Sequence, residues 1–260
     1  MLVKQNLYSV NIELYIGAMR IRAESKAASP RSRARRAAAA RPARAKGVAK
    51  AQASGESAPY HHGALHAALL EAAERLLERD GLAGLTLRAV AREAGVSHAA
   101  PTHHFGDLTG LVSELAAIGF RQFNAAATAA ADSTGHSSTE KAFARAKAYV
   151  GYAQAHPAMF SLMFRTERLD MKRPALNEAA NAAFAGLAGS IGAQRHEAIA
   201  TEALSLDQAA AIVRAWSLVH GFSMLLLDGR LSDVLHRLPE GTDAAALLDA
   251  MLKTSVTRPS

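Results

Sequence analysis

The chain has 260 residues, of which half are apolar, one is tryptophan and none is cysteine. A chain of this length forms one or two compact domains. Without cysteine there is no disulfide framework, no thiolate metal site and no cysteine nucleophile, so we expect a protein of the reducing cytoplasm. The formal net charge of +7 arises at one end, because residues 1–59 carry 12 Lys and Arg against 3 Glu.

Residues 1–59 are predicted to form a disordered basic arm. From Ser25 to Pro59 the composition is dominated by Ala, Arg, Lys, Ser, Pro and Gly, with Val48 as the only large apolar residue. Such a segment cannot bury enough apolar surface to offset chain entropy. Its charge favours a polyanionic partner, with nucleic acid first and an anionic membrane surface second. A solvated tail without a partner, or an over-long gene start, is the alternative.

The opening stretch, Met1 to Ile21, is mildly apolar but is interrupted by Lys4, Glu13 and Arg20. These charges leave no run of the eighteen or so uncharged residues that a membrane-spanning helix requires. No compact apolar run follows an early positive charge, so it is also a poor signal peptide. We therefore expect no transmembrane helix, no membrane partner and no export.

From His61 onward the apolar residues recur with helical spacing, and no alternating run of strand length is present, so the fold class is predicted to be all-α. Glycines and capping residues set the expected ends of the helices. Four helices are expected first: about Ala64–Asp80 closed by Gly81, Leu87–Ala94 capped by Thr86, His98–His104 capped by Ser97, and one that begins after Asp107. Further helices are expected from Ser137 to His156, Ala158–Arg165, Pro174–Arg195, Leu206–Leu227 and Asp243–Lys253.

The segment T-L-R-A-V-A-R-E-A-G-V-S-H-A-A-P-T-H-H-F, Thr86 to Phe105, has the layout of a helix-turn-helix. Val90 and Ala91 face the predicted core, and Gly95 allows the backbone conformation that a tight turn demands. Phe105 anchors the second helix. The residues left outward on that helix are small or polar, as entry into a DNA major groove requires. The candidate DNA-binding residues are Thr86, Ser97, His98, Ala99, Thr102, His103 and His104.

The sequence from Tyr60 to Phe120 resembles the N-terminal DNA-binding domain of the tetracycline-repressor (TetR) family of bacterial regulators. The resemblance lies in A-L-L-E-A-A-E-R-L-L, in G-L-x-x-L-T-L-R-x-V-A-R-E-A-G-V-S and in the closing H-F. The segment A-W-S-L-V-H-G-F-S-M-L-L-L-D-G-R-L, Ala215 to Leu231, resembles a C-terminal subgroup named for its Trp-His-Gly signature. Two positions depart from the family pattern: Thr102 stands where tyrosine is usual, and Leu108 where lysine is usual.

The resemblance implies the domain organisation and the function. A three-helix DNA-binding domain (60–106), a connecting helix (107–131) and a helical effector-binding and dimerisation domain (132–260) would follow the arm. The implied function is a cytoplasmic homodimer that binds a near-palindromic double-stranded DNA operator and is released by a small-molecule effector. Repression is the default, with activation left open.

Two apolar clusters are candidates for the effector pocket or for an interface. Flexible methionines and aromatic rings suit a pocket wall as well as a core, so core packing with dimer contact and direct ligand contact both stay open. The resemblance favours a small apolar or aromatic effector. The residues are Met159, Phe160, Met163, Trp216, His220 and Met224.

No catalytic, metal or cofactor site is predicted. The sequence contains no G-x-S-x-G, no phosphate-binding glycine loop and no H-E-x-x-H. His62 and His66 share a helix face, but no third ligand stands nearby. Two other classes stay as alternatives: a sequence-indifferent DNA-compacting protein driven by the basic arm, and an all-α enzyme whose resemblance is accidental.

Overall fold

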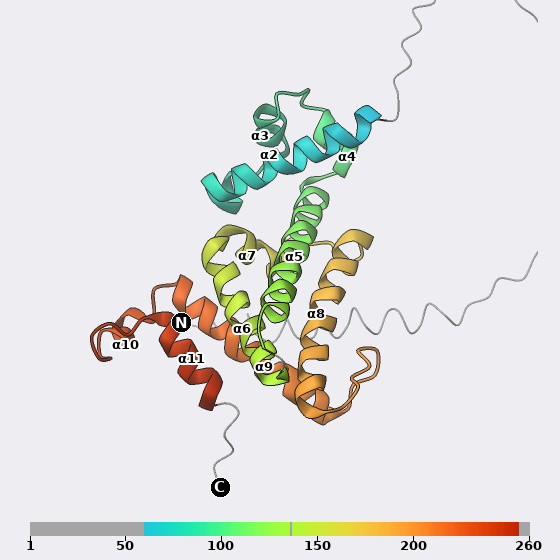
Figure 1. Ribbon diagram of the computed structural model, residues 1–260. Coiled ribbons are helices and arrows are strands. Elements are labelled where there is room, and N and C mark those ends of the chain that lie inside the picture. Colours follow the sequence, from blue (N-terminus) through green and yellow to red (C-terminus); the bar gives the residue numbers. More distant parts are fainter. Residues whose placement is uncertain (1–59, 136, 255–260) are drawn as a thin grey trace, which may run out of the picture. The chain divides into compact units, whose positions relative to one another are not determined.

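The computed structural model describes residues 60–135 and 137–254. Within these residues the elements are helices joined by turns, with no strand, which confirms the all-α prediction (Figure 1). The packing discussed below lies within one compact unit of the chain, which begins at Ala67. The predicted basic arm lies outside the described residues.

The helices follow the sequence in this order: α2 (Tyr60–Gly84), α3 (Leu87–Glu93), α4 (Ala100–Phe105), α5 (Leu108–Asp132), α6 (Ser138–Ala155), α7 (Pro157–Met163), the 3₁₀ turn η1 (Thr166–Arg168), α8 (Pro174–Arg195), α9 (Leu206–Leu227), α10 (Ser232–Leu235) and α11 (Ala244–Thr254). Neither η1 nor the short α10 was expected from the sequence.

The first helix breaks where its glycine predicts. Gly81 has φ 68° and ψ −176°, a conformation that L side chains avoid, so the regular part of α2 ends before it. Leu69, Ala72 and Leu76 follow one another at spacings of three and four, which places them on one apolar stripe of α2, and each is at most 1 % exposed. This stripe therefore forms the core side of α2.

The helix-turn-helix is present, but its second helix begins later than predicted. Thr86 caps α3 by accepting a hydrogen bond from the backbone N–H of Ala89 at 3.1 Å, as predicted. The second helix, however, begins at Ala100 and not at His98, and Ser97 does not cap it. The Ser97 hydroxyl instead accepts from the N–H of Ala99 in the preceding turn. Pro101 explains the shift, because proline is favoured in the first turn of a helix.

The long helix α5 touches more of the fold than any other described element. It packs against α4, α6, α7, α8 and η1, and it runs past α6 and α8 in Figure 1. Asp107 caps it by accepting from the N–H of Gly110 at 2.7 Å, as predicted. Leu111 and Leu115 near its beginning and Ala127 and Ala131 near its end are all buried.

Capping boxes begin two of the C-terminal helices. Ser137 with Glu140 and Ser205 with Gln208 each exchange side-chain and backbone hydrogen bonds, which confirms the predicted starts of α6 and α9. Proline begins α7 and α8. The sequence predicted the starts of these four helices because capping residues and prolines act on the backbone next to them.

Helix α9 is long and apolar enough to cross a membrane by length and composition alone. The core helix of a water-soluble protein passes the same test. Here α9 packs against α6 and α8, and Ile212, Val219 and Phe222 are buried. The helix is thus part of the C-terminal bundle.

Helices α5 and α7 come close together at Gly119. A Cβ at this position would lie 2.8 Å from Cγ and Sδ of Met159 and 2.9 Å from Sδ of Met163. Both methionines are 2 % exposed. The missing side chain of Gly119 therefore lets two thioethers pack directly on the α5 backbone.

Replacing Asp107 with alanine is expected to lower the free energy of unfolding by about 1 kcal/mol, because the N–H of Gly110 loses its cap. The matched control is Asp132→Ala at the other end of α5. There a carboxylate meets the negative end of the helix dipole, so its loss should be neutral within about 0.5 kcal/mol. Urea denaturation followed by circular dichroism measures both, and equal effects would show that Asp107 is not a stabilising cap.

Candidate nucleic-acid interface and aromatic cluster

The predicted DNA-binding residues lie at the surface of the helix-turn-helix. His104 is partly buried. The other six are exposed: Thr86, Ser97, His98, Ala99, Thr102 and His103. The first four positions flank the helices, whereas Thr102 and His103 lie on α4 itself. The His103 and His104 rings meet edge to face at 5.6 Å. The arrangement offers imidazole and hydroxyl groups that can donate to or accept from base edges.

These side chains rest on a buried support. Val90 and Ala91 of α3 are fully buried, and Phe105 at the end of α4 is 1 % exposed. Gly95, with φ 68°, makes the turn between the helices, and the N–H of Val96 donates to the carbonyl of Ala91 at 2.9 Å. The support holds α4 against α3 and leaves its polar side accessible.

Two of the arginines in this region are engaged by carboxylates. Arg79 bonds Asp80 at 2.9 Å and Glu93 at 3.3 Å, and Arg75 bonds Glu93 at 3.3 Å. The hydrogen bond from Arg79 lowers the pKa of Asp80, and those from Arg75 and then Arg79 lower the pKa of Glu93. Residues 60–125 carry 5 basic and 7 acidic side chains. The region offers little net attraction for phosphates.

Aromatic side chains from α6, α7 and α9 surround His220. The hydroxyl of Tyr149 lies 2.8 Å from Nδ1 of His220, and Nε1 of Trp216 donates to the same hydroxyl at 3.4 Å. The rings of Phe160 and Phe164 lie 5.6 and 4.7 Å from the imidazole. We call these five residues the aromatic cluster.

The neutral form of His220 fits this arrangement. The Tyr149 oxygen accepts from Trp216 and lies within hydrogen-bond distance of Nδ1 of His220, and a neutral imidazole in either tautomer can pair with this hydroxyl. Burial lowers the pKa of His220, since the aromatic surroundings cannot solvate a cation. Protonation makes Nδ1 a donor, so the Tyr149 hydroxyl then pairs with it only as an acceptor.

The structure brings part of the predicted effector set together. Phe160, Trp216 and His220 join in the aromatic cluster, whereas Met159 and Met163 pack on α5 at Gly119. Met224 is partly buried one turn beyond His220. Tyr149 was not singled out from the sequence. Tyr149 is 71 residues from its partner His220, and no local signal marks such a pair.

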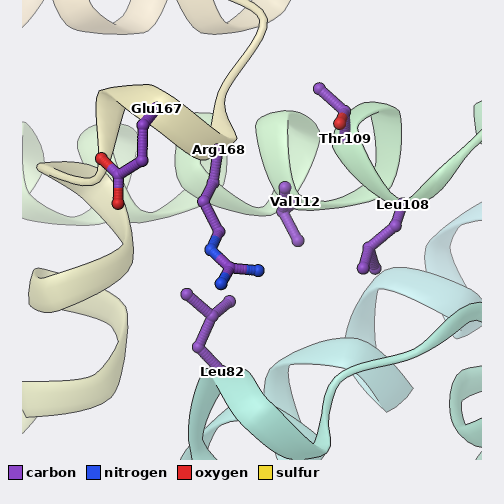
Figure 2. A pocket seen from close by; sticks show the side chains of 6 residues that line it. All are labelled: Leu82, Leu108, Thr109, Val112, Glu167 and Arg168. Carbon is purple, nitrogen blue, oxygen red and sulfur yellow. The ribbon is translucent and has the colours of Figure 1, made fainter.

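A cavity of about 240 Å³ lies elsewhere, between the end of α2, the start of α5 and η1 (Figure 2). It shares no residue with the predicted effector set. Arg168 extends its guanidinium toward Leu82 there, with Glu167 beside it. Its lining residues are Leu82, Leu108, Thr109, Val112, Glu167 and Arg168.

The described residues contain no group of three or more His, Asp or Glu side chains that could hold a metal ion. The sequence itself has no cysteine to add to such a group.

Two family models match the chain. "Bacterial regulatory proteins, tetR family" matches residues 69–115, and "Tetracyclin repressor-like, C-terminal domain" matches residues 142–254. Neither is specific to the Trp-His-Gly subgroup, which stays a resemblance of residues 215–231. No curated protein sequence matches the chain.

Several solved structures share the fold. A protein of unknown function from Rhodococcus sp. RHA1 is 34 % identical, covers 75 % of this chain and 95 % of its own, and has a TM-score of 0.61. A protein assigned to the tetR family of transcription regulators from Shewanella sp. PV-4 is 19 % identical (74 % and 97 % covered, TM-score 0.50). The transcriptional regulator FadR of Bacillus subtilis, solved with stearoyl-CoA, is 16 % identical (74 % and 98 % covered, TM-score 0.54).

Lowering the pH below about 6.5 is expected to destabilise the protein through His220. The unfolded imidazole takes up a proton near 6.5, but the buried one does so only at lower pH, so the unfolded state binds more protons in between. The melting temperature should fall from pH 7 to pH 5.5. The fall should be smaller in His220→Gln but unchanged in His236→Gln, whose side chain is exposed. Equal pH slopes in wild type and His220→Gln would contradict this assignment.

Proposed function

The chain belongs to the TetR family of bacterial transcriptional regulators, and from this premise we propose that it is a ligand-responsive repressor acting in the cytoplasm. It binds a near-palindromic operator as a homodimer and leaves it when a small apolar or aromatic effector binds. The proposed activity is the binding of DNA and of an effector, without covalent catalysis.

One observation carries the proposal. The helix-turn-helix presents His98, Ala99, Thr102 and His103 to solvent while Phe105 and Val90 anchor it in the core. Imidazole and hydroxyl groups can read base edges, and the methyl of an alanine can contact a thymine methyl. A short helix with this surface fits a major groove.

The C-terminal helices support a dimer. Within one chain 22 % of the most apolar stretch of α9 is buried, and most of the other residues of this helix are only partly buried. Leu206 is 86 % exposed and Leu225 is 43 % exposed. A second copy of the chain would cover these side chains, and a protein that binds a symmetric operator requires such a second copy. In the dimer, the two α4 helices must lie about 34–36 Å apart to enter successive major grooves.

The aromatic cluster supports the effector class. A wall of Phe, Tyr and Trp rings with one neutral histidine suits an uncharged aromatic or apolar molecule with at most a single hydrogen-bonding group. Such an effector binds more tightly to a conformation in which the two helix-turn-helix domains of the dimer have a different spacing, and the dimer then leaves the operator. A coupling of about 1–3 kcal/mol between the two ligands is typical.

Selection of bound sequences from a random duplex pool tests the proposal. We expect an enriched near-palindrome whose half-site centres lie about one helical turn apart. Recovery of unrelated sequences would contradict operator recognition and would favour a sequence-indifferent DNA-compacting protein. Competition with random duplex then gives the specificity ratio.

Alanine at His98 and His103 is expected to relax the sequence preference. Removing a bidentate hydrogen-bonded pair with a base should weaken binding to the enriched duplex by about 1–3 kcal/mol, with a smaller effect on random duplex. His236→Ala is the matched control, because it removes an exposed imidazole from the C-terminal part of the chain. Fluorescence anisotropy on both duplexes measures the effects. Equal weakening on the two duplexes would assign the histidines to phosphate binding.

Deleting residues 1–59 is expected to flatten the salt dependence of DNA binding and to leave the preferred sequence unchanged. The segment carries the excess of positive charge, while residues 60–125 are slightly acidic. For each phosphate that the shortened chain no longer neutralises, the slope of log affinity against log salt falls by about 0.9. Titrations between 50 and 200 mM salt, roughly the range in which counterion release is measured, compare the two chains. An unchanged slope would assign the arm no role in DNA binding.

A further inference from the structure

Building on the proposed function, we propose that Arg173 is a positioning residue for DNA reading: it ties the C-terminal end of the recognition helix α4 to the start of α8. It belongs to the connector between α7 and α8, residues 164–173. The connector follows the helix that carries Phe160 of the aromatic cluster. Arg173 thereby links the proposed effector region to the proposed DNA-reading helix.

Arg173 makes two hydrogen bonds across the fold. Its Nη2 donates to the backbone carbonyl of Phe105, the last residue of α4, at 2.7 Å. Its Nη1 donates to Oε1 of Glu114 on α5 at 3.2 Å. The side chains of Arg173 and Glu114 are 30 % and 22 % exposed, so the pair is only partly screened by water. One guanidinium therefore holds both α4 and α5.

The acceptor on α4 is one that a cation favours. The last carbonyls of a helix point away from it without intrahelical donors and carry the negative end of the dipole. Gly106, with φ 81°, ends α4 immediately after Phe105. A guanidinium aimed at this carbonyl forms a charge-assisted hydrogen bond, which is stronger than a neutral one.

The surrounding backbone leaves room for this contact. A Cβ at Gly110 would lie 2.2 Å from Nη2 of Arg173 and 2.0 Å from the carbonyl oxygen of Phe105. A side chain there would displace the guanidinium or the carbonyl. Gly110 thus permits the approach of Arg173 to the end of α4.

The backbone of Arg173 is also restrained. Pro174 begins α8, and the residue before a proline is restricted to extended backbone, as the φ of −63° and ψ of 126° of Arg173 show. Upstream, the N–H of Asp170 donates to Oγ of buried Ser113 on α5 at 2.8 Å. The connector is therefore anchored to α5 at one residue and to α4 at another.

Apolar packing holds the connector at Leu169, which is 8 % exposed, but it is looser at η1, immediately before that residue. The cavity of about 240 Å³ separates η1 from Leu82 and from the first turn of α5, and Arg168 reaches into it (Figure 2). A space of this kind removes dispersion contacts between its walls. The polar contacts of Arg173 therefore act beside the packing of Leu169 in setting the register between the connector and the helix-turn-helix.

Hydrogen–deuterium exchange of the free protein tests the proposal without an operator or an effector. In Arg173→Gln, the amides of residues 97–107 should exchange about tenfold faster, because the loss of a charge-assisted bond favours local opening of α4. Arg168→Gln removes the same charge from the same connector but should leave this segment unchanged. Equal rates in the two variants would overturn the proposal, as would equal acceleration in α9.

Two further variants separate geometry from charge. Arg173→Lys keeps the charge but can serve only one acceptor well, so its exchange should lie between wild type and Arg173→Gln. Gly110→Ala keeps the arginine but blocks its approach, so it should resemble Arg173→Gln. Wild-type exchange in Gly110→Ala would overturn the role of the contact.

Binding to the enriched duplex provides the functional readout. Arg173→Gln should raise Kd about tenfold with an unchanged salt slope, because Arg173 acts through α4. A slope reduced by about 0.9 would instead make Arg173 a phosphate ligand and overturn the positioning role. If wild type enriches no duplex, the proposed function fails, while the exchange experiment still decides whether Arg173 restrains α4.

Discussion

Helix α5 runs without a break from Leu108 to Asp132, about 37 Å along its axis, and its two ends belong to different parts of the fold. Its beginning contacts α4 and η1, and the rest packs against α6, α7 and α8. A helix with buried residues near both ends cannot tilt as a rigid body without disturbing the packing at both. The position of the DNA-reading helix is therefore tied to the packing of the C-terminal bundle.

The charges of the helix-turn-helix set how it can recognise DNA. Arg75 and Arg79 are bonded to carboxylates, and the region as a whole has a small acidic excess. Phosphate attraction supplies most sequence-independent affinity, whereas contacts to base edges supply discrimination. A helix-turn-helix with so few available basic side chains depends on the fit of α4 and its side chains to the groove more than on general attraction to DNA. Any constraint on the orientation of α4 then has a direct effect on recognition.

Local signals in the sequence predicted most of the helix starts but not the contacts between helices. A cap such as Thr86 involves residues at most three positions apart, whereas Ser97 was misassigned because Pro101 set the start of α4. Tyr149 meets His220 across 71 positions, and no spacing along one helix specifies which side chain of another it will face. The division of the candidate effector residues between the aromatic cluster and the contact with α5 is likewise a property of the packing.

The close approach at Gly119 has a chemical consequence. Two thioether sulfurs lie against bare backbone, with no side chain between them and α5. Oxidation of either one to the sulfoxide adds a polar oxygen to an apolar contact that has no free volume to receive it. Because both methionines are 2 % exposed, an oxidant reaches them only when the packing opens, and a sulfoxide formed then would hinder α7 from packing again on α5.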